Sequence, residues 1–223
     1  KLPFATPPLL AVGGELKNTF CVARGRDAWL SQHIGDMGSV ETLHAFDRSI
    51  ARLCRLYEIE PSAVVADAHP GYHSRQWAER SDAARLVTVQ HHHAHLAAVC
   101  AEHGVAVDTD VIGVTFDGTG YGPDSSIWGG EILVGGYARV RRAAHLRPVL
   151  LAGGDATVER PYRSALSHLA DAGIAWTDDL APVAAARSGE LGVLARQFER
   201  NVHCVSTTSM GRLFDAVSSL LGV

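Results

Sequence analysis

The sequence lacks several features that mark large classes of proteins. Its four cysteines stand far apart with no C-x-x-C pair, which argues against a disulfide framework or a zinc ribbon and predicts buried, reduced thiols. The 20 lysine and arginine residues are scattered and the net charge is −4, so nucleic acid is not an expected partner. The N-terminal stretch KLPFATPPLL carries three prolines and one positive charge, which fits neither a secretory signal nor a membrane span. We therefore predict a cytoplasmic protein without membrane contact.

The first half of the chain alternates short apolar runs with helical patterns. Hydrophobic residues make up 47% of the 223 residues, which suits one large domain or two modest ones. Between Ser39, a suitable helix cap, and Pro61, which a helix does not pass, apolar residues recur every three or four positions, so we expect a long amphipathic helix there. The alternation predicts an α/β fold. Its other expected elements are strands at 9–14, 18–24, 28–36, 62–68 and 85–90 and a short helix at 71–81.

The pattern starts again at residue 111. An apolar strand, a polar glycine-rich turn and two further strands repeat the plan of the opening residues, which favours a duplicated lobe with domains at 1–108 and 109–223. Two unrelated hairpins in one α/β domain are the alternative. The expected elements are strands at 111–116, 127–136 and 137–146, a turn at 117–126, and helices near 159–173, 189–201 and 209–221.

Four histidines occupy five positions in VQHHHAHLAAVC, at the start of a helix expected over 91–104. On this helix His91 and His95 lie one turn apart on the same face, whereas His92 and His93 rotate away. Two imidazoles at this spacing can hold one divalent metal ion, as in zinc metalloproteases. However, His92 stands where those enzymes have glutamate, so a metalloprotease is not expected. A helix start with exposed polar histidines is the alternative interpretation.

Asp117 is the candidate for a further metal ligand. It ends the apolar run VIGVTF and opens DGTGYG, and two histidines with one carboxylate suit iron(II) or zinc while leaving positions open for a substrate. The glycines of DGTGYG and of the earlier turn GGELKN would let the backbone approach a ligand, and two such turns could clamp a nucleotide. Asp-Gly is also a common hairpin turn, so DGTG alone is a weak signal.

Six stretches taken together resemble one family. GGELKNTFC, SQHIGDM, HPGYHS, VQHHHAHLAAV, FDGTGYGPDSSIWGGE and GRLFDAVSSLLG are similar, in this order, to the C-terminal module of the HypF-type carbamoyltransferases of nickel-iron hydrogenase maturation. The similarity runs from about residue 9 to the end of the chain. It implies the duplicated ribonuclease-H-like fold of actin and the sugar kinases, with the second lobe incomplete. It also implies kinship with tRNA threonylcarbamoyl-transfer enzymes and antibiotic O-carbamoyltransferases.

The resemblance implies an activity and a set of site residues. Such proteins make carbamoyl adenylate from carbamoyl phosphate and ATP, and this module passes the carbamoyl group to the C-terminal cysteine of a partner maturation protein. Lys17 and Tyr121 are the candidate catalytic side chains. A solvated turn lysine and a packing aromatic residue are the alternatives for them. The resemblance matches His91, His95 and Asp117 with ligands of a divalent metal (iron or zinc), and Gly14, Lys17, Asn18, Gly118, Thr119, Gly120 and Tyr121 with the loops around the adenylate.

Other parts of the family pattern are absent from the sequence. No acylphosphatase signature, paired zinc fingers or adenylate-forming module is present, nor is the last glycine-rich loop of the second lobe. We therefore expect that the chain alone does not make carbamoyl adenylate. Two other functions stay open: an ATP-dependent phosphotransferase of the same fold, and a non-catalytic metal-binding interaction module. Arg160 and Arg163 could pair with a substrate phosphate or form a charged helix face, and Arg212 with Asp215 could be an ordinary ion pair.

Overall fold

The computed structural model describes residues 1–82, 85–154 and 156–223. The chain forms two compact units. The first comprises residues 1–111 and 135–140, and the second comprises residues 112–134 and 141–223. The domain boundary predicted at 108/109 stays a prediction.

The first unit is built on a mixed sheet with the strand order β3-β2-β1-β4-β5. Antiparallel pairing joins β1 to β2 and β2 to β3, whereas β1, β4 and β5 run parallel. The parallel neighbours are connected through helices, as parallel pairing requires. The strands are β1 (Thr6–Ala11), β2 (Cys21–Gly25), β3 (Asp27–Leu30), β4 (Ala63–Asp67) and β5 (Leu86–Val89).

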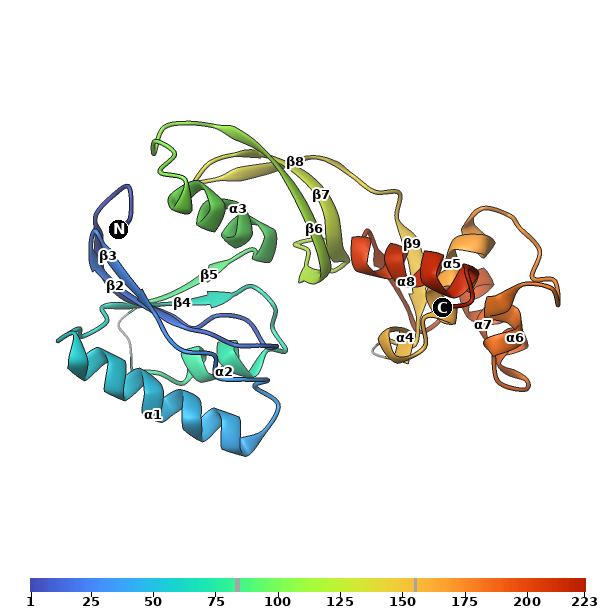
Figure 1. Ribbon diagram of the computed structural model, residues 1–223, viewed down its shortest axis with the longest axis horizontal. Helices are drawn as coiled ribbons and strands as arrows, with labels where there is room; N and C mark the ends of the chain where they lie inside the picture. The colour runs from blue at the N-terminus through green and yellow to red at the C-terminus, as the bar shows by residue number, and fades with distance from the viewer. Residues whose placement is uncertain (83–84, 155) are drawn as a thin grey trace. The chain divides into compact units, whose positions relative to one another are not determined.

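Helices cover both faces of this sheet. In Figure 1, α1 (Val40–Leu56) and α2 (His73–Glu79) lie on one face and α3 (His91–Glu102) lies on the other. The predicted cap of α1 is confirmed, since the Ser39 side chain accepts a hydrogen bond from the Thr42 backbone N–H at 3.1 Å. Phe46 of α1 packs edge-to-face on Phe20 with ring centroids 5.6 Å apart, and both are buried in the core. The sheet order and its helices are those of a ribonuclease-H-like lobe, the fold that the family resemblance implies.

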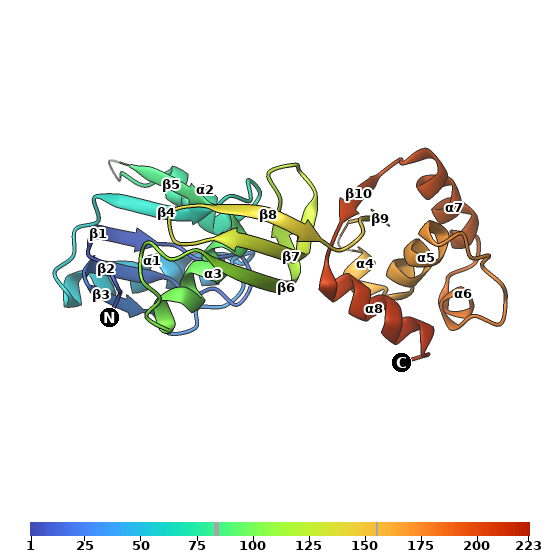
Figure 2. The same ribbon diagram turned by 90° about the horizontal axis from the view of Figure 1, so that it is seen from above.

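The second unit repeats the start of this plan. Strands β6, β7 and β8 follow one another along the chain as predicted, and the sheet order is β6-β7-β10-β9 with β8 also paired to β7. In Figure 2, α5 lies beside α8 and next to β9. The strands are β6 (Val111–Tyr121), β7 (Ile127–Gly135), β8 (Val140–His145), β9 (Val149–Ala152) and β10 (Cys204–Thr207). The helices are α4 (Ala156–Glu159), α5 (Tyr162–Asp171), α6 (Ala181–Ala185), α7 (Glu190–Arg200) and α8 (Met210–Leu220).

The glycine-rich turn is shorter than the sequence predicts. Strand β6 continues through Tyr121, so Gly118 and Gly120 lie on a strand, and the turn covers only 122–126. Pairing with β7 outweighs the turn preference of Asp-Gly, and glycine inside a strand is typical of close backbone approach. Strand β9 and the short helix α6 were not predicted, because four- and five-residue elements leave little periodicity to detect.

The described residues contain neither a disulfide nor a helix suited to cross a membrane. Among residues 1–82, 85–154 and 156–223, none of the four cysteines forms a disulfide; Cys100 is buried and the other three are partly buried. Within the same residues, no helix combines the length and the apolar character that a membrane span requires.

Candidate functional site

The histidine pair lies at the start of α3 in the first unit. Gln90 precedes the helix and caps it, since its side-chain oxygen accepts a hydrogen bond from the His93 backbone N–H at 2.9 Å. The Nε2 atoms of His91 and His95 are 3.2 Å apart, so the two Nε2 atoms face one another. His92 is fully buried, and the Nε2 atom of His93 lies 2.9 Å from the carbonyl oxygen of Gly136. The cluster therefore divides into one facing pair and two residues that fix the helix.

A buried carboxylate holds the first of these histidines. Asp67 ends strand β4, and its Oδ2 atom lies 2.6 Å from Nδ1 of His91. Its other oxygen, Oδ1, accepts a hydrogen bond from the His69 backbone N–H at 2.8 Å. The two parallel strands bring this pair together, because Asp67 is in register with Val89 of β5, two residues before His91. The sequence analysis missed Asp67, although a carboxylate at the carboxyl end of a buried parallel strand is a recognisable signal.

The glycine turn after β1 is shaped by close backbone contacts. Gly13 has a φ of +74°, and a side chain there would place its Cβ atom 2.1 Å from the Thr19 carbonyl oxygen, so only glycine fits. The Asn18 side-chain nitrogen donates to the carbonyl oxygens of Val12 at 2.9 Å and Gly14 at 2.7 Å. Because Asn18 is 1% exposed, its amide braces the turn from beneath. Its predicted contact with the adenylate stays a prediction.

Lys17 lies at the outer end of the same turn. Its side chain is exposed, its φ is +49°, and its backbone N–H donates to Oδ1 of Asp36 at 2.8 Å. A non-glycine residue in the left-handed region is uncommon and is held there by its surroundings. The backbone of this turn is therefore fixed, whereas the Lys17 side chain that it carries is exposed to solvent.

A pocket of about 430 Å³ joins the turn to the histidine pair within the first unit. This volume lies in the range of sites for small molecules and cofactors. The polar and glycine residues of its wall are Gly13, Gly14, Thr19, Asp67, His91 and His95, and the remaining lining residues are Phe20 and side chains of the five strands β1 to β5 and of α3. A polar end that carries nitrogen and oxygen ligands thus adjoins an apolar wall.

The remaining predicted site residues belong to strand β6 in the second unit. Asp117 accepts a hydrogen bond from the Gly118 backbone N–H through Oδ1 at 2.6 Å. Ser209, the cap of α8, donates from its hydroxyl to the Gly118 carbonyl oxygen at 2.7 Å. A Cβ atom on Gly129 would lie 2.4 Å from the Asp117 carbonyl oxygen. Thr119 is exposed, and the Tyr121 hydroxyl lies 3.4 Å from that of Ser125.

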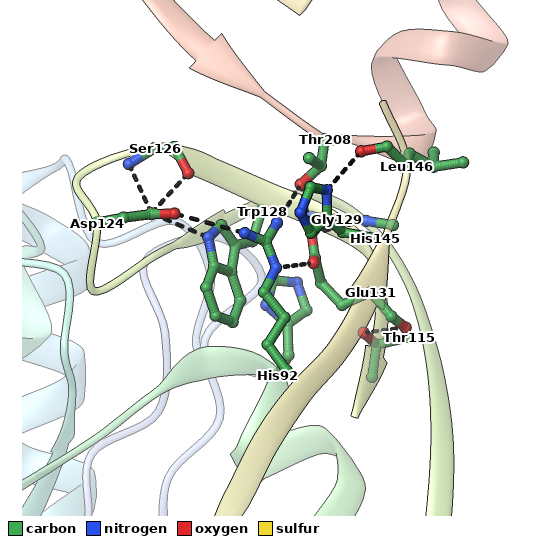
Figure 3. A network of polar contacts seen from close by, with 12 residues as sticks. His92, Thr115, Asp124, Ser126, Trp128, Gly129, Glu131, His145, Leu146 and Thr208 are labelled. Atoms are coloured by element: carbon green, nitrogen blue, oxygen red, sulfur yellow. Dashed lines mark hydrogen bonds and ion pairs between the residues drawn. The ribbon is translucent and has the colours of Figure 1, made fainter. Parts of the chain in front are cut away.

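A buried ion pair joins β8 to β7, the strand that pairs with β6. In Figure 3, Asp124, Trp128, Glu131 and Thr208 lie around one guanidinium group. The group belongs to Arg142, which forms ion pairs with Asp124 and Glu131 and donates to Thr208. Its Nε atom donates to Glu131 at 2.5 Å, and its Cζ atom lies 4.0 Å from the centre of the Trp128 ring. Burial by itself would raise the pKa of the Glu131 carboxyl, but hydrogen bonds from Arg142, Thr208 and the Gly129 backbone N–H outweigh it and lower that pKa.

Arg160, Arg163 and Arg212, the arginines with two possible roles, form ion pairs inside the second unit. Arg163 donates to Glu190 of α7 from Nε at 2.9 Å and from Nη2 at 2.5 Å, and Arg160 lies 3.6 Å from the same carboxylate. The Tyr162 hydroxyl donates to Glu190 at 2.8 Å as well. The motif therefore joins α5 to α7. Nε of Arg212 similarly lies 2.7 Å from Oδ2 of Asp215, one turn along α8.

Comparison with known proteins identifies relatives for both units. A family model described as "HypF Kae1-like domain" matches residues 4–102, and one described as "Carbamoyltransferase, Kae1-like Domain, second subdomain" matches residues 113–223. The carbamoyltransferase HypF of Synechocystis sp. is 40% identical over 96% of this chain and 30% of its own length. The probable carbamoyltransferase HypF of Methanocaldococcus jannaschii is 35% identical over 96% of this chain and 28% of its own.

Two solved structures are similar to the chain along nearly its whole length. A full-length HypF in a phosphate- and nucleotide-bound form superposes with a TM-score of 0.91 and 39% identity, over 98% of this chain and 34% of that protein. The HypF of T. kodakarensis superposes with a TM-score of 0.88 and 32% identity, over 100% of this chain and 30% of that protein. The chain thus spans about a third of the length of these four proteins.

Proposed function

The chain belongs to the HypF carbamoyltransferase family, of which it carries the Kae1-like domain, and we propose that it transfers the carbamoyl group of carbamoyl adenylate to a cysteine thiol. The acceptor is the C-terminal cysteine of a hydrogenase maturation partner, and the adenylate is made from carbamoyl phosphate and ATP. One observation carries the proposal: the Nε2 atoms of His91 and His95 are 3.2 Å apart at the wall of a pocket that the glycine turn also lines.

The residues present fit a divalent metal ion. Two imidazole nitrogens face one another, and a carboxylate on the far side of His91 suits a metal-binding histidine. In the proposal Asp117 of the second unit supplies the third ligand, which gives a donor set that iron(II) and zinc both accept. A bound metal would supply a Lewis acid for the carbonyl or phosphate oxygen of the adenylate.

The two glycine-containing segments are proposed to hold the nucleotide. Gly14 leaves the backbone of the first turn open to a ligand, since a Cβ atom there would meet nothing within 4 Å. Lys17 would place its exposed ammonium near the phosphate, where it offsets the charge that develops on the leaving group. In the second unit the segment from Gly118 to Tyr121, with Thr119 and Gly120, would contact the adenylate, and the Tyr121 hydroxyl would orient it.

The transfer itself needs no covalent enzyme intermediate. The partner's thiolate attacks the carbamoyl carbon, the carbon–sulfur bond forms, and the bond from that carbon to the phosphate oxygen breaks, so that AMP leaves with the electron pair. Three of the chain's four thiols are poor candidates for a nucleophile. Burial raises the pKa of Cys21, Cys54 and Cys204, which keeps them protonated and unreactive at neutral pH.

Bound metal in the 223-residue chain tests the proposal. Iron and zinc would be quantified by mass spectrometry after anaerobic purification, for the wild type and for His91→Ala, with and without ATP. The control is His103→Ala, an exposed histidine at the other end of the same helix. We expect about one metal per chain in the wild type and the control, and loss of metal from His91→Ala.

The nucleotide measurement separates the other functions. Under the proposal, loss of the metal weakens binding of the non-hydrolysed ATP analogue AMPPCP, because metal and adenylate share the pocket. Nucleotide binding that is unchanged in the metal-free His91→Ala variant would favour the phosphotransferase. Bound metal without any effect of nucleotide would favour the non-catalytic module, and either result would overturn the transferase.

A further inference from the structure

We infer that Asp67 is a positioning residue that fixes His91 in the tautomer and orientation needed to present Nε2 to a divalent metal ion. This inference rests on the proposed function, since it deepens the proposed metal site. The two side chains come from different elements: Asp67 ends β4, and His91 begins α3. The Asp67 carboxylate is 7% exposed, and its Oδ2 atom lies 2.6 Å from Nδ1 of His91.

Both carboxylate oxygens of Asp67 are used as acceptors. Oδ1 receives the His69 backbone N–H at 2.8 Å, which fixes the plane of the carboxylate. Oδ2 then faces Nδ1 of His91 at 2.6 Å, and a carboxylate oxygen is a hydrogen-bond acceptor. In the proposed arrangement the imidazole proton lies on Nδ1, which leaves the lone pair on Nε2, the atom that lies 3.2 Å from Nε2 of His95.

The backbone holds this arrangement in place. Asp67 pairs with Val89 in the parallel ladder of β4 and β5, and the backbone N–H of Ala68 donates to the Val89 carbonyl oxygen at 2.9 Å. Gln90 then caps α3, so only one residue separates the ladder from His91. The backbone positions of the two residues are thus set by strand register and a helix cap.

The same unit contains a second carboxylate–histidine pair that serves as a control. Glu15 accepts a hydrogen bond from the His73 backbone N–H at 2.7 Å, and its other oxygen lies 2.6 Å from Nδ1 of the same histidine. The contact distance equals that of the Asp67 pair. If the Glu15 pair is only structural and the Asp67 pair positions a metal ligand, replacing the carboxylate with an amide should lower metal affinity at Asp67 but not at Glu15.

Asp67→Asn is the sharpest substitution, because it keeps the shape of the side chain and changes only its hydrogen bonding. If the amide oxygen accepts the His69 N–H, its NH2 group faces Nδ1 of His91 as a donor. The ring must then place its own proton on Nε2, which removes the lone pair that the metal needs. Loss of such an outer carboxylate typically weakens metal binding ~10–100-fold. We expect this loss for zinc and cobalt(II) in the 223-residue chain, measured by competition with a chromophoric chelator.

Three measurements decide the inference. Glu15→Gln should leave zinc affinity within about twofold of the wild type, whereas Asp67→Asn should lose at least tenfold. Nitrogen-15 histidine spectra of the metal-free wild type should show the proton of His91 on Nδ1, a result that does not depend on how any variant folds. Full zinc affinity in Asp67→Asn, or a proton on Nε2 in the wild type, overturns the role of Asp67. If His91→Ala retains the metal, the proposed site itself is wrong.

Discussion

Replacing Glu131 with glutamine should destabilise the second unit strongly. The carboxylate is fully buried on β7 and accepts hydrogen bonds from the backbone N–H groups of Gly129 and Gly130, at 3.1 and 3.3 Å, as well as from Arg142 and Thr208. In the variant the amide oxygen can still serve the backbone, but the NH2 group meets the guanidinium donor to donor.

We expect the substitution to lower the free energy of unfolding by about 3 kcal/mol. Removing one partner of a buried ion pair costs ~3–5 kcal/mol, because the other charge is left without its partner. The low end applies, since the Arg142 side chain is 19% exposed and keeps Asp124 at 3.4 Å. Hydrogen bonds and the same guanidinium hold the pKa of Asp124 below its usual range despite partial burial, so that carboxylate remains charged and available.

Urea unfolding followed by circular dichroism, with hydrogen exchange of the β6 and β7 amides, measures this cost. Asp171→Asn is the matched control, because its ion pair with Arg147 has a similar distance of 3.0 Å but a cation that is 78% exposed. Such a surface pair is worth ~0–1 kcal/mol. The double variant Glu131→Gln with Arg142→Met should recover about half of the loss, since the unpaired guanidinium is then removed and the only carboxylate that loses a cation is Asp124, whose side chain is 49% exposed. A cost below ~1 kcal/mol for Glu131→Gln, equal to that of the control, would refute the reasoning.

Two further predictions concern close packing and pH. Gly129→Ala should destabilise the chain by ~2 kcal/mol or more in thermal melts, since its Cβ atom would lie 2.4 Å from the Asp117 carbonyl oxygen. Gly192 of helix α7 is the control, because a Cβ atom there would meet nothing within 4 Å. Gly192→Ala should therefore stabilise the chain by ~0.5–1 kcal/mol in the same melts. Burial lowers the pKa of His168 and outweighs the opposing effect of Asp171, so its contribution to stability is complete above the unfolded-state value of ~6.5 and falls away as the pH drops. Urea unfolding between pH 7.5 and 5.5 should therefore show a shallower loss for His168→Gln than for the wild type, and equal slopes would contradict this assignment.

The sequence predicts the first unit better than the second for a physical reason. In the first unit each strand is a separate apolar run between clear breaks, and Ser39 and Pro61 delimit the long helix. In the second unit DGTGYG has the composition of a turn, yet residues through Tyr121 pair with β7. Composition reports local preference only. It does not register the partner strand that keeps glycines extended, nor the cap of α8 that packs on Gly118.

The ion pair of the second unit shows a stricter limit. Glu131 and Arg142 lie on separate strands, and Thr208 is 77 positions from the glutamate to which it donates. No spacing rule relates these three residues, because their contact depends on the complete sheet. The helical spacing of His91 and His95, by contrast, is a local relation, since one helical turn brings both rings to the same face.

Asp67 lies between these two cases. Its partner is 24 positions away, which is too far for a periodicity argument, but the intervening chain is one strand–helix–strand crossover. Parallel strands in register bring their carboxyl ends together, so Asp67 at the end of SAVVAD must lie near His91, the first residue after RLVTVQ. A carboxylate at the end of one strand and a histidine just after the next therefore predict a contact between the two side chains from the sequence alone. In an α/β lobe, the residues that support a metal ligand are best sought at the end of the neighbouring parallel strand.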